Sequence, residues 1–395
     1  MNSLTQNSID TTCYHCYDKP IGELIMKHTN DSNNIKPQQI TFDVTDRCQM
    51  KCVTCSKWKT NAGDVIGKEL TTHEWKDIIS KLRSWLGEGF WFCFSGGEPF
   101  LRGDIFELAE YAKSLNIHPS TMTNAFSIEQ HYEDIMNSAI ESINISLNAV
   151  NDCNIHDISR GRGGSCEKAI NAILELNELK KQRNSNLSIN IATIMFPENL
   201  DEVIPLVEFV TKHKLNGIMF QLLDDSESFH SYNSQKGVST SNYKMPENLR
   251  NLYSKMAAKA TLVIDRLIEM KKAGHSIYNS YEQLNALKVF FKNPDDILEN
   301  IICDVGSTNF AIDPYGDVRL CFNMDPVGSV RESSPEDIWN NSKSSACRKA
   351  TKKCKMYCRM LNCNFKDNYS NFNKSFLHKA KNKIRKIYKS IFSID

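Results

Sequence analysis

Along residues 38–225, the pattern of apolar and polar positions predicts strands and helices that follow one another in alternation. The strand candidates are short β-like runs, and between them lie amphipathic stretches in which apolar side chains recur at the helical interval. Alternation of this kind predicts an α/β fold with a parallel sheet and crossover helices. Six repeats fit a doubly wound sheet or a partial (β/α)6, TIM-like barrel, and we expect the barrel. The predicted strands are 39–44, 90–94, 118–122, 142–147, 188–195 and 217–222, and the predicted helices are 72–86, 104–115, 166–181 and 200–214.

The pattern changes after residue 225. Residues 224–243 are polar and aperiodic, which is typical of a linker or lid, and Pro246 then begins a long helix that Gly274 ends. We predict an N-terminal extension (1–37), a core barrel (38–225), a linker with a helical segment (226–300), a small cysteine-rich C-terminal domain (301–365) and a basic amphipathic tail (366–395).

Charge and composition narrow the function classes. The chain has 395 residues with 48 Lys and Arg against 47 Asp and Glu, so it is not a globally basic protein and we expect no nucleic-acid partner. Its first residues lack a secretory signal and no long apolar run occurs, so we expect a cytoplasmic protein. The tail has two interpretations: a helix that binds an anionic membrane surface peripherally, or a helix docked on the protein itself.

The fourteen cysteines are clustered, which in a reducing compartment indicates metal binding or catalysis. Cys48, Cys52 and Cys55 directly follow the first predicted strand. Three thiolates at this spacing suit an iron–sulfur cluster and leave one iron without a protein ligand, which is typical of a catalytic site. The alternative is a zinc knuckle that lacks its fourth ligand, or a set of buried thiols.

Together with later motifs, this triplet resembles the radical S-adenosylmethionine (SAM) enzymes. The triplet has their C-x3-C-x2-C spacing, and Ser95-Gly96-Gly97-Glu98-Pro99 after the second strand resembles their Gly-Gly-Glu-Pro segment. The other matching residues are Thr123-Asn124 after the third strand, Ser146 at the end of the fourth, and His156-Asp157-Ile158-Ser159-Arg160-Gly161.

The resemblance implies a [4Fe–4S] cluster bound with SAM. It implies that Arg160 meets the SAM carboxylate, a task that suits a forked guanidinium. It also implies reductive cleavage of SAM to a 5′-deoxyadenosyl radical, with electrons from a low-potential donor of the flavodoxin or ferredoxin type. Thr54 stands where the family has an aromatic residue, and Trp58 is the candidate replacement near the adenine. The implied SAM-binding residues are Gly96, Gly97, Glu98, Asn124, Ser146 and Arg160.

A second group of cysteines lies on both sides of a predicted hairpin turn at 313–317, which would bring Cys303 and Cys321 together. This group resembles the auxiliary-cluster extension called SPASM, or its shortened form, twitch. The Cys-x12-Gly-x4-Cys opening fits, whereas the closing cysteine spacings depart from the full extension. We expect one auxiliary [4Fe–4S] cluster, with a zinc site as the alternative. Its predicted ligands are Cys303, Cys321, Cys354 and Cys358, with Cys363 competing for the last place.

Other cysteines have open roles. Cys13 and Cys16 form an isolated pair, and Cys93 and Cys166 are interpreted as packing residues. Cys153 is either a loop residue or, as in peptide epimerases, a thiol that returns a hydrogen atom to a substrate radical.

The predicted function is therefore that of a radical SAM oxidoreductase or maturase whose substrate is a peptide or protein. A sugar or another small-molecule precursor is the alternative substrate. The alternative from a different functional class is a protein that binds an iron–sulfur cluster or zinc and has no catalytic activity.

Overall fold

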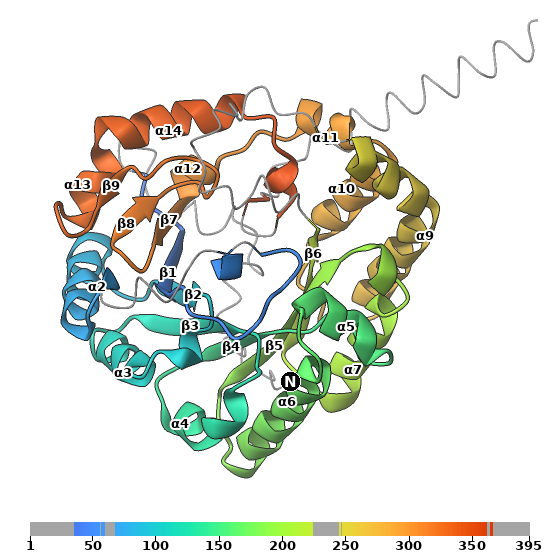
Figure 1. Cartoon of the computed structure of the whole chain (residues 1–395), viewed down its shortest axis with the longest axis horizontal. Helices are drawn as coiled ribbons and strands as arrows, with labels where there is room; N and C mark the ends of the chain where they lie inside the picture. The colour runs from blue at the N-terminus through green and yellow to red at the C-terminus, as the bar shows by residue number, and fades with distance from the viewer. Residues whose placement is uncertain are drawn as a thin grey trace, which may run out of the picture.

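The computed structural model describes residues 35–55, 57–59, 68–223, 245, 247–361 and 364–365. A nine-stranded sheet in the order β6-β5-β4-β3-β2-β1-β7-β8-β9 forms its centre, and helices cover its outside (Figure 1). The first six strands are parallel, which confirms the predicted α/β fold. They are β1 (Gln39–Thr45), β2 (Trp91–Gly96), β3 (His118–Thr123), β4 (Ser142–Ser146), β5 (Ser188–Met195) and β6 (Gly217–Leu222).

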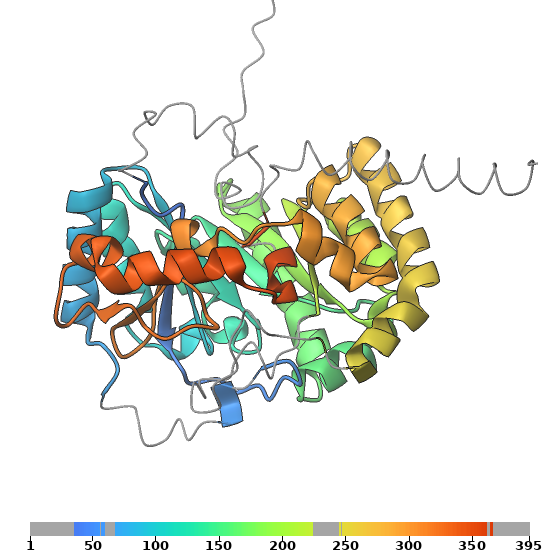
Figure 2. The same cartoon turned by 90° about the horizontal axis from the view of Figure 1, so that it is seen from above.

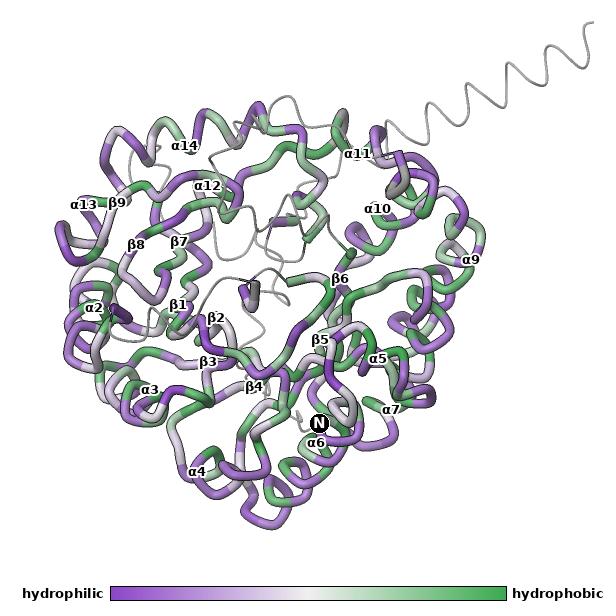
Figure 3. The backbone as a smooth tube through the Cα atoms, in the orientation of Figure 1, coloured by the Kyte–Doolittle hydropathy of each residue, from purple (hydrophilic) through white to green (hydrophobic). Residues whose placement is uncertain are grey.

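The crossover helices agree with the predicted ones to within a few residues, and two more were not predicted. The predicted set corresponds to α2 (Thr72–Leu86), α3 (Ile105–Ser114), α6 (Ser165–Gln182) and α7 (Val203–His213). The additional helices are α4 (Tyr132–Asn137) and α5 (Cys153–Arg160). Hydrophobic and hydrophilic positions alternate along these helices (Figure 3), and buried hydrophobic residues of α2, α3, α6 and α7 belong to the core cluster formed with the strands.

Aromatic side chains hold the outer face of the first strands against α2. The ring of Phe42 lies 4.5 Å from that of Phe92 and 5.1 Å from that of Trp75, and Phe94 packs edge-on against Phe92. All four side chains are buried. This packing fixes β1 and β2, whose carboxyl ends carry the candidate site.

The C-terminal part extends the same sheet. Strand β7 (Asn309–Ile312) pairs in parallel with β1, and β8 (Asp317–Arg319) returns antiparallel to it, which confirms the predicted hairpin. Strand β9 (Gly328–Ser329) ends the sheet. The helices of this half are α9 (Glu247–Lys272), α10 (Tyr281–Lys292), α11 (Pro294–Asn300), α12 (Val305–Thr308), α13 (Pro335–Asn340) and α14 (Ser342–Lys353).

Two sets of contacts join the C-terminal part to the barrel. Beside β1, Trp339 of α13 packs against Trp85 of α2, and Arg331 pairs with Glu74 at 2.8 Å. At the other edge, Asn279 exchanges two hydrogen bonds with the backbone of Phe220 on β6, each of 2.7 Å. Helix α14 runs between these regions (Figure 2). The C-terminal part therefore contacts the six parallel strands at both of their outermost members, β1 and β6.

Some predictions fall outside the described residues. These are the N-terminal extension up to residue 34 with Cys13 and Cys16, the polar stretch 224–243, Cys363, and the basic tail. The domain boundaries stay predictions. Within the part that the structure describes, no helix has the length and apolar character needed to cross a membrane.

Candidate functional site

A cavity of about 180 Å³ lies at the carboxyl ends of β1–β4. Active sites of parallel α/β folds form at this end because the loops after the strands converge there. The predicted cluster cysteines and most of the predicted SAM-binding residues meet at this cavity. Its lining includes Cys48, Cys52, Cys55, Gly96, Gly97, Asn124, Ser146 and Arg160, together with Thr54 and Trp58.

The segment from Cys48 to Cys55, here called the cluster loop, is hydrogen bonded to the end of α5. The amide of Lys51 donates to the carbonyl of Arg160 at 3.2 Å, and the amide of Val53 donates to that of Ser159 at 3.0 Å. Gly161 ends α5 with φ of +64°, and a Cβ atom there would lie 2.1 Å from the Lys51 carbonyl oxygen. Only glycine allows this close approach.

The three thiols of the cluster loop are partly buried. Burial raises the pKa of Cys48 to about 12 and also raises the pKa of Cys55, and neighbouring thiols add to both effects. Thiols bind metal as thiolates, so loading this site releases protons. Among the described residues, no His, Cys, Asp and Glu side chains converge as they do around a single metal ion. A four-iron cluster spreads its ligands over separate irons, so this finding concerns single-ion sites.

Arg160 points toward the same thiols. Its Nη1 lies 4.0 Å from the sulfur of Cys52, and its Nε is buried without a hydrogen-bond partner. A buried donor of this kind requires an acceptor, and a carboxylate matches a guanidinium best. The site is therefore suited to a molecule that presents a carboxylate beside the cluster loop, as SAM does.

The glycines after β2 bring two backbones close together. Gly97 donates to the Thr45 carbonyl at 2.7 Å, and a Cβ atom on it would lie 2.2 Å from the Arg47 carbonyl oxygen. Gly96 has φ of +116° and is equally crowded by Thr45. These contacts keep side chains out of this wall and leave backbone groups to face the cavity.

Glu98 lies behind the cavity wall and is not one of its lining residues. It is 1% exposed and accepts hydrogen bonds from the Thr123 hydroxyl and the Asn124 amide, both at 2.8 Å. Burial raises the pKa of Glu98 to about 7, and these hydrogen bonds partly oppose the shift. Glu98 therefore ties the ends of β2 and β3 together. The Asn124 side chain in turn points its amide at the Cys48 sulfur, 3.6 Å away.

An ion-pair cluster that the motifs did not single out anchors the other end of the cluster loop. Lys57 pairs with Asp43 at 2.9 Å and with Asp46 at 3.1 Å, and all three side chains are largely buried. Tyr315 from the C-terminal hairpin donates to Asp46 at 2.9 Å. The only available sequence signal was the position of Lys57, two residues after Cys55.

The second group of cysteines is also brought together. Cys303, Cys321, Cys347 and Cys358 are buried and Cys354 is partly buried. Burial raises the pKa of Cys303 and Cys321; the nearby Cys354 adds to both shifts, and Cys347 adds to that of Cys321. The side-chain amide of Asn323 points at the sulfur of Cys358 at 3.7 Å. Cys347, which the spacing did not select, thus belongs to the same neighbourhood.

Cys153 is placed differently from its prediction. It begins α5 and forms a disulfide with Cys166 on α6, with the two Cα atoms 5.3 Å apart. A sulfur in a disulfide carries no hydrogen to donate, and Cys153 does not line the cavity. The structure therefore contradicts the suggested role of Cys153 as a hydrogen donor. The interpretation of Cys166 as a packing residue captured its complete burial but missed its bond.

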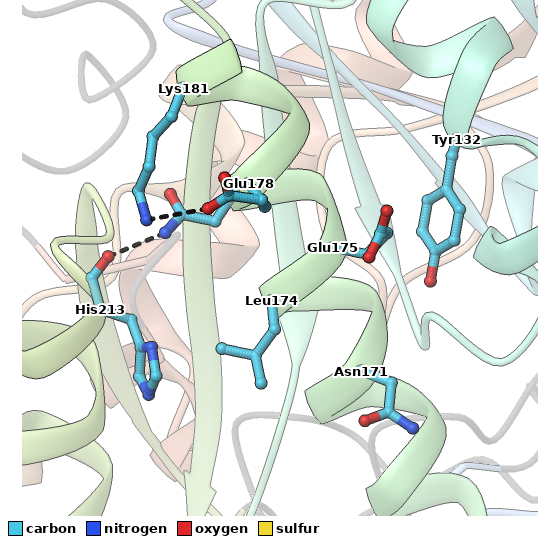
Figure 4. A pocket seen from close by; sticks show the side chains of 8 residues that line it. Tyr132, Asn171, Leu174, Glu175, Glu178, Lys181 and His213 are labelled. Carbon is cyan, nitrogen blue, oxygen red and sulfur yellow. Dashed lines mark hydrogen bonds and ion pairs between the residues drawn. The ribbon is translucent and has the colours of Figure 1, made fainter.

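A larger cavity of about 510 Å³ lies away from the cysteines, on the outer side of α6 (Figure 4). Its lining includes Tyr132, Glu175, Glu178, Lys181 and His213. Glu178 and Lys181 pair with each other at 3.6 Å. No cysteine lines this cavity, so the candidate chemistry stays at the carboxyl ends of the strands.

Comparisons with known proteins agree with this geometry. The radical SAM superfamily matches residues 42–210, and the SPASM iron–sulfur cluster-binding domain matches residues 303–364. The AdoMet-dependent heme synthase of Methanosarcina barkeri is 29% identical over 42% of this chain and 45% of its own length. Mycofactocin maturase MftC of Mycolicibacterium smegmatis is 26% identical over 72% of this chain and 64% of its own. The matches thus span less than two thirds of these relatives.

A solved structure has the same fold. The structure of Streptococcus suis SuiB bound to the precursor peptide SuiA superposes with a TM-score of 0.56, covering 88% of this chain and 75% of that one at 16% identity. Over residues 42–210 the chain is therefore similar to the radical SAM superfamily, and over residues 303–364 to its SPASM domain. The cofactors of this class are a [4Fe–4S] cluster bound with SAM and, in the SPASM domain, auxiliary iron–sulfur clusters.

Replacing Gly161 by Ala should displace the cluster loop, because the new Cβ atom has no room beside Lys51. We expect the reconstituted variant to lose about four irons per chain, those of the cluster held by this loop. Gly163→Ala is the matched control, since a Cβ atom there meets nothing within 4 Å. Iron analysis checks the prediction, and full iron in Gly161→Ala would contradict it.

The raised pKa of Glu98 predicts a pH-dependent stability. A carboxyl whose pKa is higher in the folded protein stabilises the fold below its unfolded pKa, near 4.5, and loses this contribution as the pH rises through about 7. Relative to Glu98→Gln, the metal-free wild type should lose up to about 3 kcal/mol of unfolding free energy between about pH 5 and about pH 8. Urea unfolding at both pH values measures this difference. Parallel pH profiles would show that Glu98 does not titrate in this range.

Proposed function

We propose that this protein is a radical SAM maturase that removes a hydrogen atom from a peptide or protein substrate. One observation supports the proposal most strongly. Cys48, Cys52, Cys55 and Arg160 all line the same cavity, which lies at the carboxyl ends of the strands. When bound, the cluster and SAM supply a 5′-deoxyadenosyl radical by reductive cleavage of SAM.

In this proposal, the residues of the chain bind the cluster and orient SAM. Cys48, Cys52 and Cys55 would hold the cluster, and three protein ligands for four irons would leave one iron available to SAM. The guanidinium of Arg160 receives the carboxylate through its unpartnered Nε. The remaining proposed contacts come from the backbone of Gly96 and Gly97 and from the side chains of Asn124 and Ser146, all on the cavity wall.

Glu98 and Trp58 have supporting positions in this proposal. Glu98 holds the wall through Thr123 and the Asn124 amide rather than from the cavity surface. Trp58 lines the cavity and donates to the Cys52 carbonyl at 3.0 Å, so its indole is the proposed neighbour of the adenine. Both residues keep the site shaped and partly closed, which protects a reactive radical from water.

The auxiliary cluster is proposed to bind to the C-terminal cysteines, with Cys303, Cys321, Cys354 and Cys358 as its ligands. Cys321 lies near Cys303 and Cys354, and the buried Cys358 lies beside Asn323, two residues after Cys321. These positions support a cluster with no open iron. Because reductive cleavage consumes an electron, we propose a low-potential donor of the flavodoxin or ferredoxin type as a partner.

The peptide substrate is supported by the relatives. The mycofactocin maturase is named for maturation, and the SuiB structure contains a precursor peptide. A small-molecule substrate is the second candidate, and the likeness to a heme synthase favours it. The fold is shared by proteins of both kinds, so the substrate must be found by experiment.

The proposal predicts slow release of 5′-deoxyadenosine from SAM by the reconstituted, chemically reduced protein. A peptide encoded next to its gene should increase this release and change in mass. Cys52→Ala should abolish both effects because it removes a cluster ligand, whereas Cys93→Ala, a cysteine of β2 outside the cavity lining, should retain them. Liquid chromatography with mass spectrometry measures both products. Release by Cys52→Ala would contradict the assigned site, and stimulation by small molecules alone would contradict the peptide substrate.

A further inference from the structure

Arg359 is a buried cation beside the second group of cysteines. It lies in the short 3₁₀ helix η10 (Tyr357–Met360) and is 3% exposed. Its guanidinium donates to the carbonyls of Met356, Ile301 and Cys354. Its three nitrogens therefore donate to neutral carbonyls, and none of these hydrogen bonds goes to an anionic group.

No carboxylate of the described residues forms an ion pair with Arg359. On the neighbouring helix α11, Asp295 pairs with Arg250 at 2.9 Å and accepts a hydrogen bond from Tyr357. Asp304 lies near Cys303, where its charge opposes that of Arg359, but it forms no ion pair with Arg359. Burying a guanidinium without an anion is costly, because neutral carbonyls only partly replace its hydration. The position thus requires a negative group nearby.

The cysteines around Arg359 provide that group once they hold a cluster. Arg359 is close enough to Cys303 for its charge to oppose the rise that burial causes in the pKa of that thiol. Four thiolates around a [4Fe–4S] core carry about two net negative charges. The carbonyls that Arg359 binds belong to Cys354 itself and to Ile301, two residues before Cys303.

We propose that Arg359 is the positioning residue and buried counter-charge of the auxiliary cluster. It holds the two loops that supply Cys303 and Cys354, and its positive charge stabilises the more negative, reduced cluster. Arg359 therefore raises the reduction potential of the auxiliary cluster, as charges and hydrogen bonds around such clusters do. This inference rests on the auxiliary cluster of the proposed function and not on the identity of the substrate.

The test uses the full chain with Cys48, Cys52 and Cys55 replaced by Ala, so that only the auxiliary cluster remains. Iron content and an EPR-monitored redox titration are measured in this parent and in three variants of it. Arg359→Gln removes the charge and should shift the midpoint potential to a more negative value. Arg359→Lys keeps the charge and should stay near the parent. Arg266→Gln, an exposed arginine of α9 that pairs with Glu269, is the control and should change nothing.

Each outcome has a defined meaning. Loss of iron in Arg359→Gln with retention in Arg359→Lys also supports the proposal, because the charge then holds the cluster. An unchanged potential in Arg359→Gln, or equal loss of iron in both Arg359 variants, overturns it. If the parent contains no iron, the C-terminal cysteines hold no cluster and the proposal is overturned. That failure is separate from a failure of SAM cleavage, which is measured on the wild type.

Discussion

The backbone hydrogen bonds between the cluster loop and the end of α5 are the constraint on which the candidate site depends. They hold the backbone on both sides of Cys52 against Ser159 and Arg160. The thiols and the Arg160 guanidinium therefore reach one cavity. The contact is possible because Gly161 has no side chain. At the other end of the loop, Lys57 is paired with the buried Asp43 of β1 and with the partly buried Asp46 just after that strand. The loop is thus attached to the barrel on both sides before any cofactor binds.

The C-terminal part adds a second requirement, which is electrostatic. Tyr315 of its hairpin contacts Asp46 beside the cluster loop, so the two groups of cysteines belong to one connected framework. Within the SPASM domain, Arg359 is buried among carbonyls and near thiols. Thiolates that hold a cluster would place negative charge beside this guanidinium. We therefore expect the folding of this region and the loading of its cluster to be coupled.

Much of the fold follows from local sequence pattern, and the rest depends on distant contacts. Each of the first six strands lies between stretches of helical periodicity, and most have apolar residues at alternate positions, as Ile40, Phe42 and Val44 are in β1. This pattern is why they were predicted nearly to the residue. Helix α5 was missed because it is short and largely polar, with Ile158 fully on the solvent side at 72% exposed. The bond between Cys153 and Cys166 depends on how α5 and α6 pack, which spacing does not reveal. Likewise, nothing in the sequence distinguishes Arg359 from a surface arginine.

The central claim is that one chain holds two clusters and that only the cluster at the barrel cavity binds SAM. EPR spectroscopy of the reduced, reconstituted wild type before and after addition of SAM tests this most directly. With roughly eight irons per chain, the account predicts two overlapping signals, of which one changes when SAM is added and the other does not. A single signal from about four irons, or two signals that both ignore SAM, would contradict the account.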